Sequence, residues 1–161
     1  MKVYHGSIEC VIAPTIRESN RTLDYGNGFY TTTSYEQAEE WVRRKMKDSH
    51  VTKGFVNEYE MDGDKLASFK CLFFDSPTDE WIDFVMNNRL KKDFVHDYDV
   101  VYGPVANDRV YTCFALYEGG VMSKQNLLAE LKTYQLIDQY LFHTERALQI
   151  LTFIQAKEIR L

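Results

Sequence analysis

The segment from Tyr35 to Met46 places its apolar residues three and four positions apart, which is the spacing of one face of an α-helix. Ser34 stands immediately before this run and Gln37 follows three residues later, as in a helix N-cap with its reciprocal hydrogen bond. The pattern predicts a helix that begins after Ser34 and ends near Ser49. Its repeating face carries Tyr35, Ala38, Trp41, Val42, Lys45 and Met46.

Four more helices are predicted where a residue that favours a helix N-terminus precedes apolar residues at helical spacing. The expected cap residues are Ser76, followed by Pro77 at the first helical position, then Asn107 or Asp108, then Ser123, and finally Thr144. The last of these helices is short, and we expect it to hold Leu151.

Runs of aromatic, β-branched and alternating apolar residues predict strands between the helices. The predicted strands cover residues 2–5, the run after Gly28, 54–61, 99–105, 139–143 and the residues up to Leu161. We expect Gly103-Pro104 to end the strand that contains it. Strands and helices in this order, without strict βαβ alternation, predict an α+β fold, and the 161 residues are expected to form a single domain, 1–161.

The composition narrows the function classes. A net charge of -5 argues against an extended surface for nucleic-acid phosphates, which bind through many Lys and Arg side chains. Three widely spaced cysteines without a C-x-x-C pair indicate a reducing compartment, and no apolar run has the length of a membrane span. The sequence therefore predicts a soluble, cytoplasmic protein without membrane contact. Lys45 and its basic neighbours are interpreted as a solvated helix face.

Most catalytic signatures are absent. The sequence has no G-x-S-x-G, no phosphate-binding loop ending in Gly-Lys-Ser/Thr and no H-E-x-x-H. The four histidines lack the paired spacing of metal ligands, so no metal site is predicted. Two glycine-containing stretches remain, His5-Gly6-Ser7 after the first strand and Gly26-Asn27-Gly28-Phe29-Tyr30 leading into the second. The first stretch ends a strand and the second begins one, and each contains a turn that a ligand can approach closely. This arrangement suggests a site between the two stretches.

Together these stretches resemble the ADP-ribosyltransferase superfamily, in particular its poly-ADP-ribose-polymerase branch. The matching residues are His5, Gly6, Ser7, Gly26, Gly28 and Tyr30, followed by an aromatic, Trp41, eleven positions after the tyrosine. Four longer motifs resemble a bacterial domain family of uncharacterised function within that superfamily, often encoded beside a small partner as in toxin and antitoxin pairs. They are Tyr-His-Gly-Ser, Asp-Tyr-Gly-Asn-Gly-Phe-Tyr-Thr-Thr, Tyr-Gly-Pro-Val-Ala-Asn-Asp and Gln-Tyr-Leu-Phe-His-Thr-Glu-Arg-Ala-Leu.

The resemblance implies a split β-sheet core with inserted helices, and it implies NAD as the substrate. In this interpretation His5 contacts the adenosine ribose, the Gly6 backbone holds the nicotinamide amide, and Tyr30 and Trp41 stack on the nicotinamide ring. Gly28 lies in the loop that approaches NAD, and Ser7 and Arg17 are expected at a ribose and at the pyrophosphate. Aromatic faces suit a flat cationic ring because they bind it through stacking and cation–π attraction.

The family's late-strand catalytic acid is replaced by Gln139, while Ala38 stands where the family has a small hydroxyl residue. A glutamine carbonyl can accept a ribose hydroxyl, but it carries no charge and cannot act as a base. The expected catalytic residues are His5, Tyr30 and Gln139. The expected function is mono-ADP-ribosyl transfer to an unknown macromolecule by the toxin of a toxin–antitoxin pair. Two alternatives stay open: an inactive NAD- or protein-binding module of the same fold, and a transferase acting on RNA or a phosphate.

Overall fold

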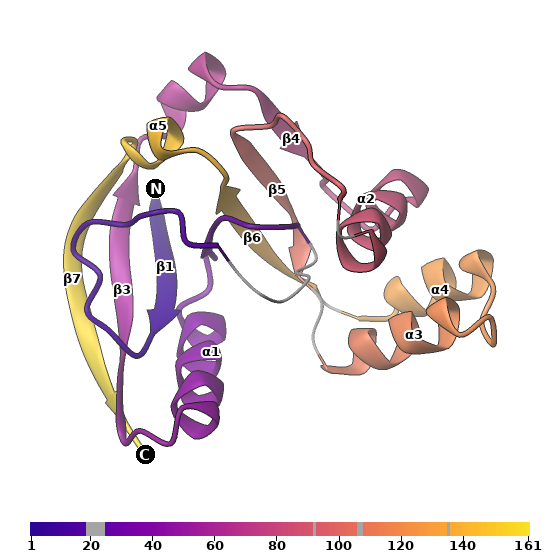
Figure 1. Cartoon of the computed structure of the whole chain (residues 1–161), viewed down its shortest axis with the longest axis horizontal. Coiled ribbons are helices and arrows are strands. Elements are labelled where there is room, and N and C mark those ends of the chain that lie inside the picture. Colours follow the sequence, from indigo (N-terminus) through magenta and orange to yellow (C-terminus); the bar gives the residue numbers. More distant parts are fainter. Residues whose placement is uncertain (19–24, 92, 106–107, 135) are drawn as a thin grey trace.

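The computed structural model describes residues 1–18, 25–91, 93–105, 108–134 and 136–161. These residues form two β-sheets (Figure 1). The first has strand order β1-β3-β7 and is antiparallel throughout, whereas the second has order β2-β6-β5-β4 with β4 parallel to β5. The strands are β1 (Lys2–Ser7), β2 (Phe29–Thr31), β3 (Lys53–Met61), β4 (Cys71–Phe73), β5 (Val100–Val105), β6 (Ile137–Phe142) and β7 (Leu151–Arg160). Helices and mixed sheets together confirm the predicted α+β fold class.

The two sheets meet where β1 passes β2. Tyr4 and Thr32 exchange backbone hydrogen bonds of 2.8 and 3.0 Å at this junction. Behind it, buried apolar side chains from both sheets form one cluster, because the alternating residues of each strand face the other sheet. This cluster includes Val3, Phe29, Tyr59, Val100, Phe142 and Ile150.

Helix α1 (Tyr35–Asp48) covers the three-stranded sheet, as the apolar spacing predicts. The side chain of Ser34 accepts a hydrogen bond from the Gln37 N–H at 3.2 Å, which confirms Ser34 as the N-cap. Ala38, Val42 and Met46 are fully buried on its inner face, where they pack against the sheet. The helix therefore fixes the backbone of β1 from one side.

Three helices, α2 (Asp79–Leu90), α3 (Asp108–Glu118) and α4 (Lys124–Leu131), lie on the far side of the four-stranded sheet (Figure 1). Their apolar faces enclose a second core with Trp81, Phe114, Leu127, Leu131 and Leu141, all fully buried. The predicted cap of α4, Ser123, is confirmed, and so is the end of α3 at Gly119-Gly120. The alternative cap Asn107 lies outside the described residues.

Three sequence expectations about element ends are wrong. Thr78, rather than Ser76, caps α2 and accepts from the Trp81 N–H. Pro104 does not end β5, because the strand continues to Val105 and pairs with β6. This pairing does not use the backbone nitrogen of Pro104, so the missing N–H of proline costs no hydrogen bond between the strands. Leu151 starts β7 because α5 (Glu145–Leu148) is a single turn. A 3-10 helix, η1 (Gly63–Ser68), connects β3 with β4.

Candidate functional site

A cavity of about 170 Å³ lies between the end of β1 and the start of β2. Its walls include four residues that the sequence predicts for the site, namely His5, Ser7, Arg17 and Gly28. The remaining walls come from Val11, Thr15, Phe29 and Lys45. Residues that are far apart in the sequence thus meet because the β1–β2 junction brings the two glycine-containing turns together.

His5 is fixed in one orientation and one tautomer. Its Nδ1 lies 2.7 Å from the Tyr30 carbonyl oxygen, and its ring stacks on Phe29 with centroids 4.2 Å apart. A carbonyl oxygen only accepts hydrogen bonds, so Nδ1 carries the proton and Nε2 is left as an acceptor. Burial, with the positive charges of Lys45 and Arg17, lowers the pKa of His5 to about 3. The imidazole is therefore neutral at pH 7.

Two cationic side chains complete this cavity. The ammonium of Lys45 donates a hydrogen bond of 2.6 Å to the Gly6 carbonyl oxygen, and burial together with Arg17 lowers its pKa. Arg17 forms an exposed ion pair of 3.2 Å with Glu9. A neutral imidazole acceptor beside two cations suits a ligand that offers a hydroxyl group and a negative charge. Lys45 is exposed, in agreement with our interpretation of a solvated helix face, and its ammonium in addition contacts the end of β1.

We did not predict Lys45 as a site residue from the sequence, although its position on the repeating face of the helix could have indicated it. Lys45 lies on the same repeating face of α1 as Trp41 and Ala38, and this face packs against β1. A long side chain at such a position can extend past the apolar stripe and reach the strand's end with its charged group. The spacing therefore indicated that Lys45 shares the strand-facing side of α1, and the packing of α1 on β1 brings its ammonium to Gly6.

The backbone of β1 at Gly6 lies close to α1 at Trp41. Tyr4 uses the β2-facing edge of β1 to bond Thr32, so Gly6, two residues on, presents its own N–H and C=O on that edge. A Cβ at Gly6 would lie 2.4 Å from the Ala38 carbonyl oxygen and 3.2 Å from the Trp41 Cβ. Only glycine permits this close approach of α1. Trp41 is half-buried behind it, and its stacking on nicotinamide stays a prediction.

The loop from Gly26 to Gly28 is shaped by its glycines. Gly26 has φ +82°, in the left-handed region, and its carbonyl accepts a 2.6 Å hydrogen bond from the Tyr30 hydroxyl. A Cβ at Gly28 would lie 2.8 Å from the Phe142 carbonyl oxygen. Tyr30 packs against the helical core, whereas its neighbour Phe29 faces the other sheet and His5. His5 therefore contacts Tyr30 through the backbone rather than through its ring.

Gln139 lies apart from this cavity. It pairs with Gly103 in β5, is 1% exposed, and shares its strand face with the fully buried Leu141. Its amide nitrogen has no hydrogen-bond partner among the residues that the structure describes. An unpaired buried amide is costly in a protein interior, so this position is chemically unusual. Neither Gln139 nor Tyr30 lines the cavity that holds His5.

No group of three or more potential metal ligands is found within the described part of the chain. None of the helices in the described residues is both long and apolar enough to span a membrane.

Comparison with known protein families shows the family to which the chain belongs. Residues 1–153 match the model of a family described as "Protein of unknown function (DUF3990)". The chain belongs to this family. No curated protein and no solved structure matches it. The description of DUF3990 names no activity, so the resemblance to ADP-ribosyltransferases stays a prediction for this member of the family.

Proposed function

We propose that the chain binds NAD at the β1–β2 junction and transfers its ADP-ribose to a macromolecule. The observation that supports this proposal most is the neutral, oriented His5 beside Lys45 and Arg17. Its free Nε2 accepts a hydroxyl of the adenosine ribose, while the two cations face the pyrophosphate. Gly28 lets the loop backbone approach the dinucleotide, and Ser7 contacts a ribose.

The proposed reaction breaks the bond between the ribose C1′ and the nicotinamide nitrogen, and the bonding electron pair leaves with nicotinamide. A nucleophile of the acceptor then bonds to C1′ and loses its proton. Positive charge develops on the ribose as this bond breaks, as in glycoside hydrolysis. By the resemblance, Tyr30 and Trp41 would bind the nicotinamide ring and the Gln139 carbonyl would orient the ribose, although none of the three lines the cavity that holds His5. Gln139 supplies a dipole where a carboxylate would supply a charge, so turnover is slow.

The biological role in this proposal is the toxin of a bacterial pair, held inactive by a small antitoxin protein in the cytoplasm. The free thiols of Cys10, Cys71 and Cys113 suit a reducing compartment. The burial of Gln139 favours a second candidate function, in which the chain binds NAD or a protein partner without catalysis.

The experiment uses NAD labelled on its adenylate group, incubated with the purified protein and a bacterial lysate. Parallel reactions contain the Tyr30→Ala and Gln139→Ala variants and a control, Gln149→Ala, which alters an exposed glutamine at the end of α5. We expect label on a macromolecule with the wild type and the control but with neither site variant. Protease and nuclease digestion then distinguish protein acceptors from RNA.

Thermal unfolding with and without NAD separates the two candidate functions, because a ligand that binds only the native state raises Tm. Label transfer supports the transferase. A raised Tm without label transfer or nicotinamide release supports the binding module and contradicts catalysis. The absence of both effects contradicts the transferase and the NAD-binding module, whereas binding of a protein partner alone predicts neither effect.

A further inference from the structure

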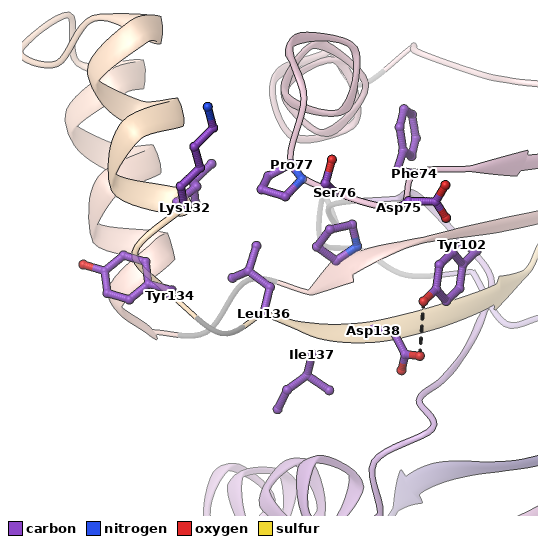
Figure 2. Close-up of a pocket in the computed structure, with 12 residues that line it drawn as sticks. Phe74, Asp75, Ser76, Pro77, Tyr102, Lys132, Tyr134, Leu136, Ile137 and Asp138 are labelled. Carbon is purple, nitrogen blue, oxygen red and sulfur yellow. Dashed lines mark hydrogen bonds between the residues drawn. The ribbon is translucent and has the colours of Figure 1, made fainter.

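A groove of about 300 Å³ lies between the start of β6, β5, the end of α4 and the segment after β4 (Figure 2). It continues into an open hollow of about 590 Å³ that shares Tyr102, Leu136, Ile137 and Asp138 with it. Neither hollow includes His5 or another wall of the NAD cavity proposed above. The groove is therefore a separate surface feature.

The carboxylate of Asp138 is held in place by neutral donors. Its Oδ1 accepts from the Thr33 N–H at 3.0 Å and from the Thr33 hydroxyl at 2.7 Å. The Tyr102 hydroxyl lies 3.4 Å from Oδ2, as the dashed line in Figure 2 marks. These bonds orient the carboxylate without neutralising its charge, so it can still bind a cation.

Asp75 adds a second negative charge to the same groove. Within the described part of the chain, neither Asp75 nor Asp138 forms an ion pair. Burial is the main cause that raises the pKa of Tyr102 to about 12, and the negative charges of Asp138 and Asp75 contribute in the same direction. Lys132 stands on the rim, and Figure 2 shows its ammonium directed away from Asp138.

Apolar and aromatic side chains form much of the remaining wall, together with Ser76 and Lys132. Leu131, Leu136 and Ile137 line the groove beside Tyr102, so a purely polar ligand would leave this surface unused. A guanidinium group matches the walls better than an ammonium does, because it is planar, stacks on aromatic rings and binds carboxylates through two donors. Apolar neighbours of that guanidinium would bury the aliphatic walls.

We propose that this groove docks a protein segment in which an arginine is flanked by apolar residues, with the guanidinium between Asp75 and Asp138. The arginine side chain lies along Tyr102, and its neighbours cover Leu136 and Ile137. Docking requires no NAD, so the test of this interaction surface is independent of the test of the transferase proposal.

The test uses the synthetic peptide acetyl-Leu-Arg-Leu-amide and its citrulline counterpart, which has the same shape without the charge. Backbone amide resonances of the isotopically labelled full chain are followed by NMR as each peptide is added, without NAD. We expect saturable shifts at Asp75, Tyr102 and Leu136 with the arginine peptide. The citrulline peptide should bind about tenfold more weakly, a difference of about 1.4 kcal/mol in binding free energy. Added salt should reduce this difference in affinity between the two peptides.

Three variants make the test specific. Asp138→Asn removes the oriented charge, and Asp75→Asn removes an exposed charge that has no hydrogen bond within the described residues, so its fold should be intact. Asp64→Asn removes one exposed charge at η1 and serves as the matched control. We expect weaker binding for the first two variants and unchanged binding for the third. Equal affinity for the two peptides, unchanged binding by Asp75→Asn, or no saturable shift in the groove would overturn the proposal.

Discussion

The Nδ1 atom of His5 donates a hydrogen bond of 2.7 Å to the carbonyl oxygen of Tyr30 and thereby joins β1 to β2 one residue beyond the Tyr4–Thr32 bridge. The bond ties together the two sheets of the fold. It also dictates which imidazole nitrogen faces a ligand, because the protonated nitrogen is already used. Structure and proposed function therefore depend on the same neutral histidine.

This neutrality predicts how stability depends on pH. The pKa of His5 is about 3 in the folded chain and about 6.5 when unfolded, so between these values the unfolded state binds the proton more readily. Its contribution is complete above pH 6.5 and is lost as the pH falls towards 3. In His5→Gln, the free energy of unfolding should fall less steeply between pH 6 and 4, by at most about 1.4 kcal/mol per pH unit.

Urea unfolding at pH 4, 5, 6 and 7 measures this slope. His50→Asn is the control, because His50 is exposed and its positive φ is one that asparagine tolerates. The control should keep the wild-type slope. An identical slope in His5→Gln would show that His5 does not become protonated on unfolding in this range.

Gly6→Ala tests the contact between β1 and α1. The new Cβ would meet the Ala38 carbonyl oxygen at 2.4 Å, and backbone cannot move aside as a flexible side chain does. We expect a loss of about 2–3 kcal/mol in the free energy of unfolding. Gly63→Ala, where nothing lies within 4 Å of the new Cβ, should change it by about 0.5 kcal/mol or less. Chemical denaturation measures the free energy of unfolding of both variants. Similar losses in the two would contradict the close contact between β1 and α1 as the cause.

Asp99→Ala tests a buried carboxylate that joins three segments. Its oxygens accept from the Lys70 N–H at 3.0 Å, the Thr144 hydroxyl at 2.8 Å and the Arg146 guanidinium at 2.6 Å. Burial raises its pKa, but these three donors outweigh that effect and hold the pKa below its ordinary value. Removing the carboxylate leaves the donors unpaired, so we expect a loss of about 3 kcal/mol in stability.

Asp97→Ala is the matched control for Asp99→Ala. Asp97 forms its ion pair with Lys70 at the surface, where its side chain is 77% exposed. Solvent screens such a pair, so the change should cost about 0.5 kcal/mol or less in thermal and urea unfolding. Equal losses in the two variants would contradict the importance of burial at Asp99.

Gln139→Glu tests whether the amide limits catalysis. A carboxylate at this buried position would supply a negative charge opposite the positive charge of the proposed transition state, so we expect nicotinamide release from NAD to increase by a factor of about 10²–10³, the range for one well-placed group. Chromatographic measurement of nicotinamide between pH 6 and 9 would detect this. Gln149→Glu, at an exposed position, should have no effect. Unchanged turnover in a folded Gln139→Glu variant would exclude a catalytic role for this position.

The sequence by itself determined the local elements. The spacing from Tyr35 to Met46 and the caps Ser34, Ser123 and Thr144 correctly predicted helices, because capping and amphipathic spacing depend on neighbours a few residues away. It also identified His5, Ser7, Arg17 and Gly28, which line one cavity. Element ends near Ser76 and Pro104 were wrong because competing cap residues and strand pairing decide them.

Only the tertiary structure decided how these elements meet. Pairing of β6 with β5 buries Gln139 beside Gly103 and leaves its amide nitrogen unpaired among the described residues. Packing of α1 on β1 carries the Lys45 ammonium to the Gly6 carbonyl, and the β5–β6 register creates the groove around Asp138. Such relationships depend on which surfaces pack together, and that is set by burial of the whole apolar core rather than by local spacing.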